Sequence, residues 1–245
     1  MIAVFKKDFG SYFSSALGYI VLGLYLMISG FFFWWVCFFK GYNNLAYAIN
    51  NMQTVVFFLV PLITMRSFAE EKRQRTDQAL LTAPVKLWEV VCGKYLSALA
   101  LYLICNLSYF MYAFSLSIAV KDKGIPWGTF MTAWIAIVLM GAALLAINLF
   151  YSSITEFQII AAVIGLGTGM LLSLYDTIVD ALLNFFNELF SIEHQLVVLD
   201  KLSFTSHYMN LIRGVFNPAD VVFYLSWVGL FLFLTNRVLD RKRWA

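Results

Sequence analysis

Long runs without a charged residue are the feature that most constrains what this sequence can fold into. Residues 16–39 and 95–120 contain no Asp, Glu, Lys or Arg, and about 20 consecutive apolar residues are enough for a helix to cross a bilayer. The whole chain is 62% hydrophobic and 13% charged, whereas soluble proteins are about 25% charged. The sequence therefore predicts an all-α integral membrane protein.

Six segments have the length and composition of membrane spans, and charged or turn-forming stretches separate them. An even number of spans returns the chain to its starting side, so both termini are expected on the same side of the membrane. A single transmembrane domain is predicted over residues 1–245, with spans at residues 16–39, 46–66, 95–120, 127–151, 157–175 and 219–238.

Lys and Arg are distributed unevenly between the two sides that these spans define. Twelve of the seventeen precede the first span, follow the last span or lie between the second and third spans, and only five lie on the other side. Because cytoplasmic segments carry an excess of Lys and Arg, both termini and the central loop are predicted to be cytoplasmic. Topology accounts for these charges, which leaves no basic face for a nucleic-acid partner.

Two other regions are amphipathic. Residues 1–15 place aromatic side chains on one helical face and Lys6 and Lys7 off it, which predicts a helix lying along the inner membrane surface; the alternative is a lead-in to the first span. Residues 176–218 mix acids with apolar residues at helical spacing. We expect re-entrant or interfacial helices there, on the extracytoplasmic side, because a further span would bury Glu188.

Residues 67–94 form a cytoplasmic region with a dense charge pattern. From Arg66 to Lys94 there are six basic and four acidic residues, and helix-forming residues precede the interruption at Pro84. An apolar helical face begins again at Leu87. A short charged helix between two spans is suited to being pushed by another protein, although a solvated loop that only fixes topology would have the same composition.

The sequence lacks the motifs of nucleotide hydrolysis and metal catalysis. It contains no G-x-x-x-x-G-K-[ST] phosphate loop and no H-E-x-x-H zinc motif, and no nucleophile–base pair is evident. His194 and His207 lie in the outer segment with Glu193 and Asp200, where ordinary interfacial histidines explain them better than a metal site. We therefore predict no catalytic residue, metal or cofactor in this chain.

Several motifs resemble the membrane subunit of ABC type-2 exporters, with the permease of the gliding-motility ABC system as the nearest type. These motifs are PLITMRSFAEEKR from Pro61 to Arg73, LLTAPV from Leu80 to Val85, and GKYL from Gly93 to Leu96. Such permeases usually have Gly-Thr-Ile-Glu where this chain has Arg75-Thr76-Asp77-Gln78. The resemblance extends over essentially the whole chain.

The resemblance implies a multi-pass protein of the bacterial cytoplasmic (inner) membrane that works with other subunits. Two permease subunits, identical or different, would form the transport path, and a separate subunit would bind ATP and Mg. Residues 67–94 would contain the coupling helix that contacts this ATPase. Its contact residues would be Arg66, Glu70, Glu71, Arg73, Arg75, Thr76, Leu80, Leu81 and Pro84.

The cargo is less constrained by the sequence. Four uncharged polar residues within lipid depth are candidates for the translocation path: Asn106, Tyr112, Asn148 and Thr168. Hydrogen bonds between helices are the alternative explanation for them. No ionisable residue lies at the middle of a span, which favours a hydrophobic or amphiphilic cargo over an ion.

Two function classes remain open from the sequence. The first is the permease subunit of an ATP-driven exporter, surrounded by membrane lipid. The second is a structural or regulatory scaffold that anchors an extracytoplasmic partner or machine. Copurification with an ATPase would distinguish the two.

Overall fold

The protein is a bundle of helices in a computed structural model that describes residues 1–73, 75, 86–119, 124–190 and 203–244. Every regular element in these ranges is a helix, and six helices are long and apolar enough to cross a membrane. A helix satisfies all its backbone hydrogen bonds within one segment, as hydrocarbon requires. The predicted all-helical membrane fold with six spans is confirmed.

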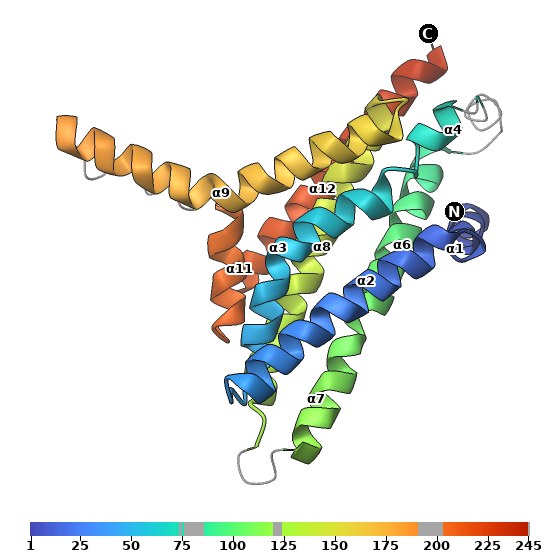
Figure 1. Ribbon diagram of the computed structural model, residues 1–245. Helices are drawn as coiled ribbons and strands as arrows, with labels where there is room; N and C mark the ends of the chain where they lie inside the picture. Colours follow the sequence, from blue (N-terminus) through green and yellow to red (C-terminus); the bar gives the residue numbers. More distant parts are fainter. Residues whose placement is uncertain (74, 76–85, 120–123, 191–202, 245) are drawn as a thin grey trace.

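Figure 1 shows the described helices in chain order. The first half contains α1 (Ile2–Ser14), α2 (Ala16–Phe33), the π-helix η1 (Trp34–Phe39), α3 (Ala46–Thr64), α4 (Ala69–Arg73), α6 (Leu87–Asn106) and α7 (Ser108–Ala119). The second half contains α8 (Trp127–Ile154), α9 (Gln158–Phe190), α11 (Phe204–Ile212) and α12 (Pro218–Trp244).

Helix α8 lies at the centre of the bundle and packs against α3, α6, α9, α11 and α12. Residues 140–149 of this helix are all buried, as expected for a helix that is apolar on every side. Gly141 permits one close approach, because a Cβ atom there would lie 2.2 Å from Cζ of Tyr102. The Tyr102 hydroxyl donates to the Ile137 carbonyl at 2.8 Å, which joins α6 to α8.

Two glycines of the fifth span lie at close contacts between helices. A Cβ atom at Gly165 would lie 1.8 Å from Oδ1 of Asn148, and one at Gly169 would lie 3.1 Å from Cβ of Phe57. These glycines let α9 approach α8 and α3 closely. Gly167 has no such neighbour within 4 Å.

Two helices extend beyond the predicted spans. The helix that contains the third span begins at Leu87, where an apolar helical face was predicted to begin, so the end of the predicted coupling region belongs to α6. Between α6 and α7, Leu107 interrupts the helix. Helix α9 continues without a break from the fifth span to Phe190. Residues 176–190, which were predicted to begin the outer segment, are therefore a continuation of the fifth helix. A separate helix, α11, lies within residues 176–218, for which re-entrant or interfacial helices were expected.

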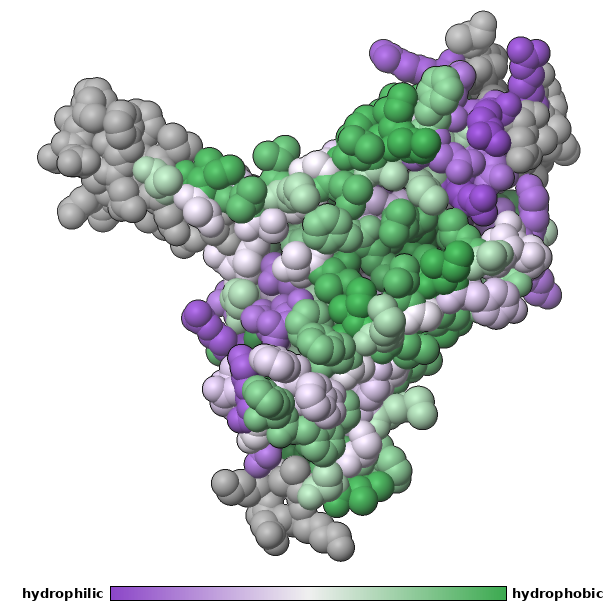
Figure 2. Space-filling view, in the orientation of Figure 1, coloured by the Kyte–Doolittle hydropathy of each residue, from purple (hydrophilic) through white to green (hydrophobic). Residues whose placement is uncertain are grey.

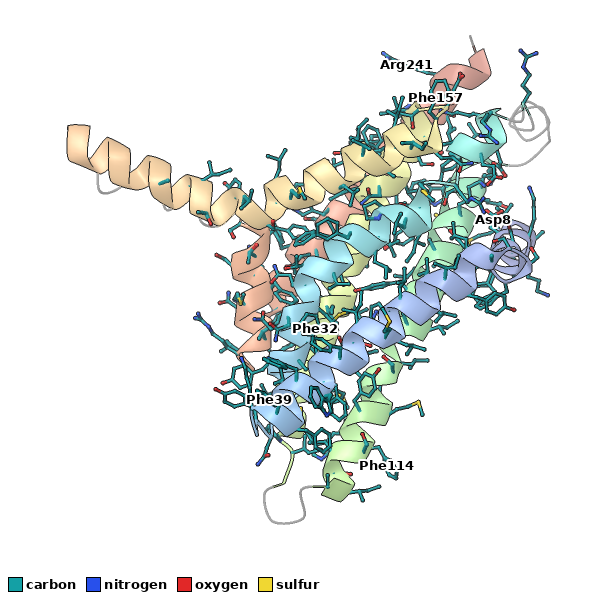
Figure 3. The ribbon with its side chains drawn as sticks, viewed as in Figure 1. Asp8, Phe32, Phe39, Phe114, Phe157 and Arg241 are labelled. Carbon is teal, nitrogen blue, oxygen red and sulfur yellow. The ribbon has the colours of Figure 1, made fainter. Side chains whose placement is uncertain are left out.

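The two ends of the bundle differ in polarity. The N-terminus, the C-terminus and α4 lie at the same end (Figure 1), and hydrophilic residues gather there while apolar residues cover the middle (Figure 2). Asp8, Phe157 and Arg241 mark this end, and Phe39 and Phe114 lie toward the opposite end (Figure 3). Both termini therefore share one end with α4, as the even number of spans requires.

Candidate coupling site

Lys94 of α6 lies at the centre of a charged cluster at the α4 end of the bundle. Its side chain is 2% exposed, and Nζ lies 3.1 Å from Oδ2 of Asp8 and 3.0 Å from Oε1 of Glu71. Nζ also donates to the Ser67 carbonyl at 2.7 Å and lies 5.0 Å from the centre of the Phe68 ring. One ammonium group thus connects α1, the turn before α4, α4 itself and α6.

These contacts explain how a lysine can be buried in an apolar helix. A buried charge is costly unless ion pairs and hydrogen bonds replace water around it. An ammonium group has three donors, and Lys94 has two carboxylates and one carbonyl as acceptors. The charge therefore does not end the helix, and α6 extends through Lys94 to Leu87.

Close packing of α1 on α6 brings Asp8 to Lys94. A Cβ atom at Gly93 would lie 3.0 Å from Cβ of Val4 and 3.1 Å from the Met1 carbonyl oxygen, so a larger residue would displace α1. The Tyr12 hydroxyl donates to the Ile63 carbonyl of α3 at 3.1 Å. Burial raises the pKa of Tyr12 to about 12, which keeps this donor protonated.

Helix α4 is also attached to the corner between α8 and α9. The hydroxyl of Ser152 accepts from the backbone N–H groups of Phe68 (3.1 Å) and Ala69 (3.2 Å). Nζ of the buried Lys72 donates to the Ser153 carbonyl. The start of α4 would otherwise leave backbone donors without acceptors, so residues of α8 complete a helix that is far from them in the sequence.

The structure places five of the nine predicted contact residues. Glu71 pairs with Lys94 and, at 3.3 Å, with Nζ of Lys7. Arg66 and Glu70 form an i,i+4 ion pair with Nε and Oε2 3.6 Å apart, and Arg73 is exposed at the end of α4. Arg75 has a positive φ of 57°, the left-handed conformation in which many helices end. Thr76, Leu80, Leu81 and Pro84 lie outside the described residues.

Arg73 lies beside the start of α9. It lines a groove of about 390 Å³ together with Phe157, Gln158, Ile159 and Ile160. Two of the predicted contact residues therefore have different surroundings. Glu71 points into the cluster around Lys94, and the exposed Arg73 is accessible to another protein.

The four candidate path residues are all held by hydrogen bonds. Oδ1 of Asn106 accepts from the Tyr25 hydroxyl at 2.8 Å, and the Tyr112 hydroxyl lies 3.1 Å from Oγ of Ser29; both pairs join α2 to the third span. Nδ2 of Asn148 donates to the Leu144 carbonyl at 2.8 Å. The bonds of Asn106 and Tyr112 agree with the alternative of hydrogen bonds between helices, whereas the Asn148 bond lies within α8.

Thr168 completes this set. Its hydroxyl lies 3.1 Å from the Tyr151 hydroxyl of α8 and donates to its own helix at Ile164, 2.8 Å away. Asn106 and Tyr112 thus lie against α2. Asn148 and Thr168 lie at the contact between α8 and α9. A transport path through these residues stays a prediction.

A second buried charge lies where α11 meets α12. Asp220 is 1% exposed, and its Oδ1 lies 2.5 Å from Nδ1 of His207; the His207 ring stacks on Phe223 with centroids 4.2 Å apart. Among the described residues, no group of three metal-ligating side chains occurs. His194, Glu193 and Asp200 lie outside the described residues.

Lys94, Ser152 and Lys72 were not predicted to be parts of the site. The Lys94 signal was present, because a lone lysine followed by a long apolar helix requires a buried partner. Placing the start of the span after Lys94 removed that signal. Nothing in the sequence near Ser152 indicates that its hydroxyl would cap α4.

The fold and this cluster define a polytopic membrane protein with a short charged helix held between its spans. The family model described as ABC-2 family transporter protein matches residues 38–243, more than four fifths of the chain, so the protein belongs to the ABC-2 transporter family. Its members are membrane components of ABC transporters and not the ATPase, and they work with an ABC ATPase subunit. None of the curated proteins compared with the chain matches it.

Proposed function

We propose that the protein is the permease subunit of an ATP-driven exporter and that α4 receives the force from the ATPase. The position of α4 is the observation that supports this proposal most directly. Its contacts reach α1 and α6 through Lys94, and they reach the end of α8 through Ser152. A displacement of α4 would be transmitted to the spans α6 and α8 and to the helix α1 at once. In this proposal both termini and α4 face the cytoplasm, as the excess of Lys and Arg on that side favours.

Arg73 is the residue that we assign to direct contact with the ATPase. It is exposed at the end of α4 and lines the groove at the start of α9. Glu71 is assigned to transmission, because its carboxylate is bound to Lys94 of α6 and Lys7 of α1. ATP and Mg would be bound by the partner subunit.

The transport path would form between two permease subunits, and the cargo would be hydrophobic or amphiphilic. Apolar side chains of α9 support this arrangement, since Ile159 is 77% exposed and Val163 is 60% exposed. Such side chains are compatible with lipid and with a second permease subunit. A gliding-motility system is one assembly in which this permease would operate, in line with the motif resemblance.

Copurification and coupling measurements test the proposal. The tagged full chain, solubilised from its native membrane, should copurify an ABC ATPase, and Arg73→Glu should reduce that recovery about tenfold or more. Glu71→Ala should leave membrane insertion and ATP hydrolysis but uncouple hydrolysis from transport in proteoliposomes. The matched control is Arg213→Glu, which inverts an exposed charge at the end of α11.

Two results would contradict the assignment. One is unchanged transport in both Glu71→Ala and Arg73→Glu. The other is a native complex in which no ATPase touches α4; a complex of that kind would favour the scaffold that anchors an extracytoplasmic machine.

A further inference from the structure

A polar cavity of about 450 Å³ lies between α1, the start of α2, α4 and α6. Small-ligand pockets are typically about 300–1,000 Å³ in volume. Six of the lining residues are charged, with three cations and three anions: Lys7, Arg66, Lys94, Asp8, Glu70 and Glu71. The lining therefore has no net charge, although it is dense in charge of both signs.

One hydrogen-bond donor in the lining of this cavity, Nε–H of Arg66, lacks an acceptor in the part of the chain that the structure describes. This Nε atom is buried and has no hydrogen-bond partner among the described residues. The side chain as a whole is 39% exposed, and Nε lies 3.6 Å from Oε2 of Glu70, an ion pair that is too long for a hydrogen bond. A buried guanidinium N–H without an acceptor costs free energy. Guanidinium groups match phosphate oxygens in shape and charge, so a phosphate in the cavity would satisfy this donor.

The position of α1 indicates which phosphate compound would reach the cavity. Phe5, Phe9 and Phe13 follow one another at four-residue spacing, with ring centroids 5.6 and 5.2 Å apart. An amphipathic helix with such an aromatic face lies in the plane of the membrane interface. Asp8 and Ser11, which line the cavity, lie on another face of the same helix, so the cavity lies at the depth of lipid headgroups.

The balance of charges selects among lipids. Because the lining has no net charge, an anionic headgroup or a free phosphate ion would give the occupied cavity a net negative charge. A zwitterionic headgroup brings its own cation. A primary ammonium group can also donate hydrogen bonds to a carboxylate, and a quaternary ammonium group cannot.

We propose that the cavity between α1, α4 and α6 binds the headgroup of a zwitterionic phospholipid with a primary ammonium group. Its phosphate accepts from Arg66, and its ammonium group lies at the Asp8 side of the cavity. The site adjoins the cluster around Lys94 that joins α4 to the spans. A bound lipid therefore bridges the interfacial helix and α4 at the point where both contact α6.

Native mass spectrometry of the delipidated full-length permease tests this proposal. The protein is incubated with equimolar phosphatidylethanolamine, phosphatidylcholine and phosphatidylglycerol that carry identical acyl chains. We expect phosphatidylethanolamine to be retained preferentially. Arg66→Gln should lower that retention about tenfold, the equivalent of one charge-assisted hydrogen bond, and Arg213→Gln on α11 should leave it unchanged.

Two serine variants test the cavity without changing any charge. Ser11→Phe fills the cavity from α1 and should also abolish the preference, whereas Ser14→Phe, at an exposed position that does not line the cavity, should not. Asp8→Asn should remove the distinction between phosphatidylethanolamine and phosphatidylcholine while phosphate binding at Arg66 remains.

Three results would overturn the proposal. They are equal retention of the three lipids, preference for phosphatidylglycerol, and retention that neither Arg66→Gln nor Ser11→Phe reduces. Inorganic phosphate at millimolar concentration is the last probe. Displacement of the lipid by this ion would show that the site takes a free phosphate, and undiminished retention supports the lipid as the source.

Discussion

Two buried charged residues in different parts of the molecule are held in different ways. Lys94 at the α4 end has two carboxylates, one carbonyl and an aromatic ring around its ammonium group. Asp220 at the start of α12 has His207 at one oxygen, and its other oxygen is buried without a hydrogen-bond partner among the described residues. Both are at most 2% exposed.

The difference shows which junction tolerates loss of a partner. Partners from α1, α4 and the turn before α4 share the charge of Lys94. Removing the lysine therefore takes the central cation away from two partly buried anions, Asp8 and Glu71.

The pair of Asp220 and His207 joins α12 to α11 through one oxygen of Asp220. The Tyr224 hydroxyl, which donates to the Phe204 carbonyl, and the Phe204 ring connect the same two helices. The α4 end is therefore expected to depend on one shared charge, and the α11–α12 junction on several separate contacts.

Removing Lys94 should have the largest effect. Lys94→Met keeps the length of the side chain but leaves Asp8 and Glu71 without their buried cation. We expect the free energy of unfolding, measured by titration with SDS in mixed micelles, to fall by about 3–5 kcal/mol. Lys86→Met, at an exposed position just before α6, is the matched control. Equal stability of the two variants would show that the cluster does not hold the helices.

Neutralising Asp220 should cost less. Asp220→Asn retains the shape of the side chain but replaces the charged partner of His207, and one charged hydrogen bond contributes about 1.5–3 kcal/mol. The same SDS titration measures the loss, and Glu156→Gln at an exposed position serves as the control. A loss as large as that of Lys94→Met would remove the contrast between the two junctions.

Removing the Ser152 hydroxyl tests whether α8 holds α4. Ser152→Ala takes away the acceptor for the N–H groups of Phe68 and Ala69, and loss of a helix-capping hydroxyl costs about 1 kcal/mol. Hydrogen exchange should increase at these two amides and remain unchanged in Ser226→Ala, whose hydroxyl bonds only within its own helix. Unaltered exchange at Phe68 and Ala69 would contradict the attachment.

The smallest effect is expected from Tyr12, and it depends on pH. Tyr12→Phe removes the hydrogen bond to Ile63 and should cost about 0.5–1 kcal/mol. The folded-state pKa of about 12 is higher than the ordinary value of about 10. The contribution of the hydroxyl is therefore fully present below pH ~10 and is lost as the pH rises through 12.

Stability profiles of the wild type and Tyr12→Phe should accordingly converge between these two pH values. Tyr19→Phe is the control, because Tyr19 is 62% exposed. A constant difference between wild type and Tyr12→Phe across this range would show that the Tyr12 proton is not held by burial.

The sequence predicted the membrane fold because hydrocarbon imposes a simple requirement. A run such as residues 16–39 is too apolar and too long for any other structure, and six spans were recognisable from length and charge alone. Close approach at Gly165 and Gly169 was also predictable, since a missing side chain acts locally. The end of the fifth span was not, because α9 continues through residues whose composition alone suggested a break.

Part of the candidate site was predictable, because local charge density is visible in the sequence. Charge density between the second and third spans marked Arg66 and Glu71, but a pattern along one segment cannot show which distant residues complete it. Ser152 is 83 residues from Ala69 in the sequence, and Asp8 is 86 residues from Lys94. Their contacts depend on how the helices pack.

The sequence by itself determined the class of fold, the number of spans and the common side of the two termini, because each follows from local hydrophobicity and charge in a bilayer. Tertiary structure decided which partners neutralise Lys94 and that a polar cavity forms beside α1. These features depend on side chains from separate helices meeting in space. Burial makes a charge acceptable only where such partners meet it.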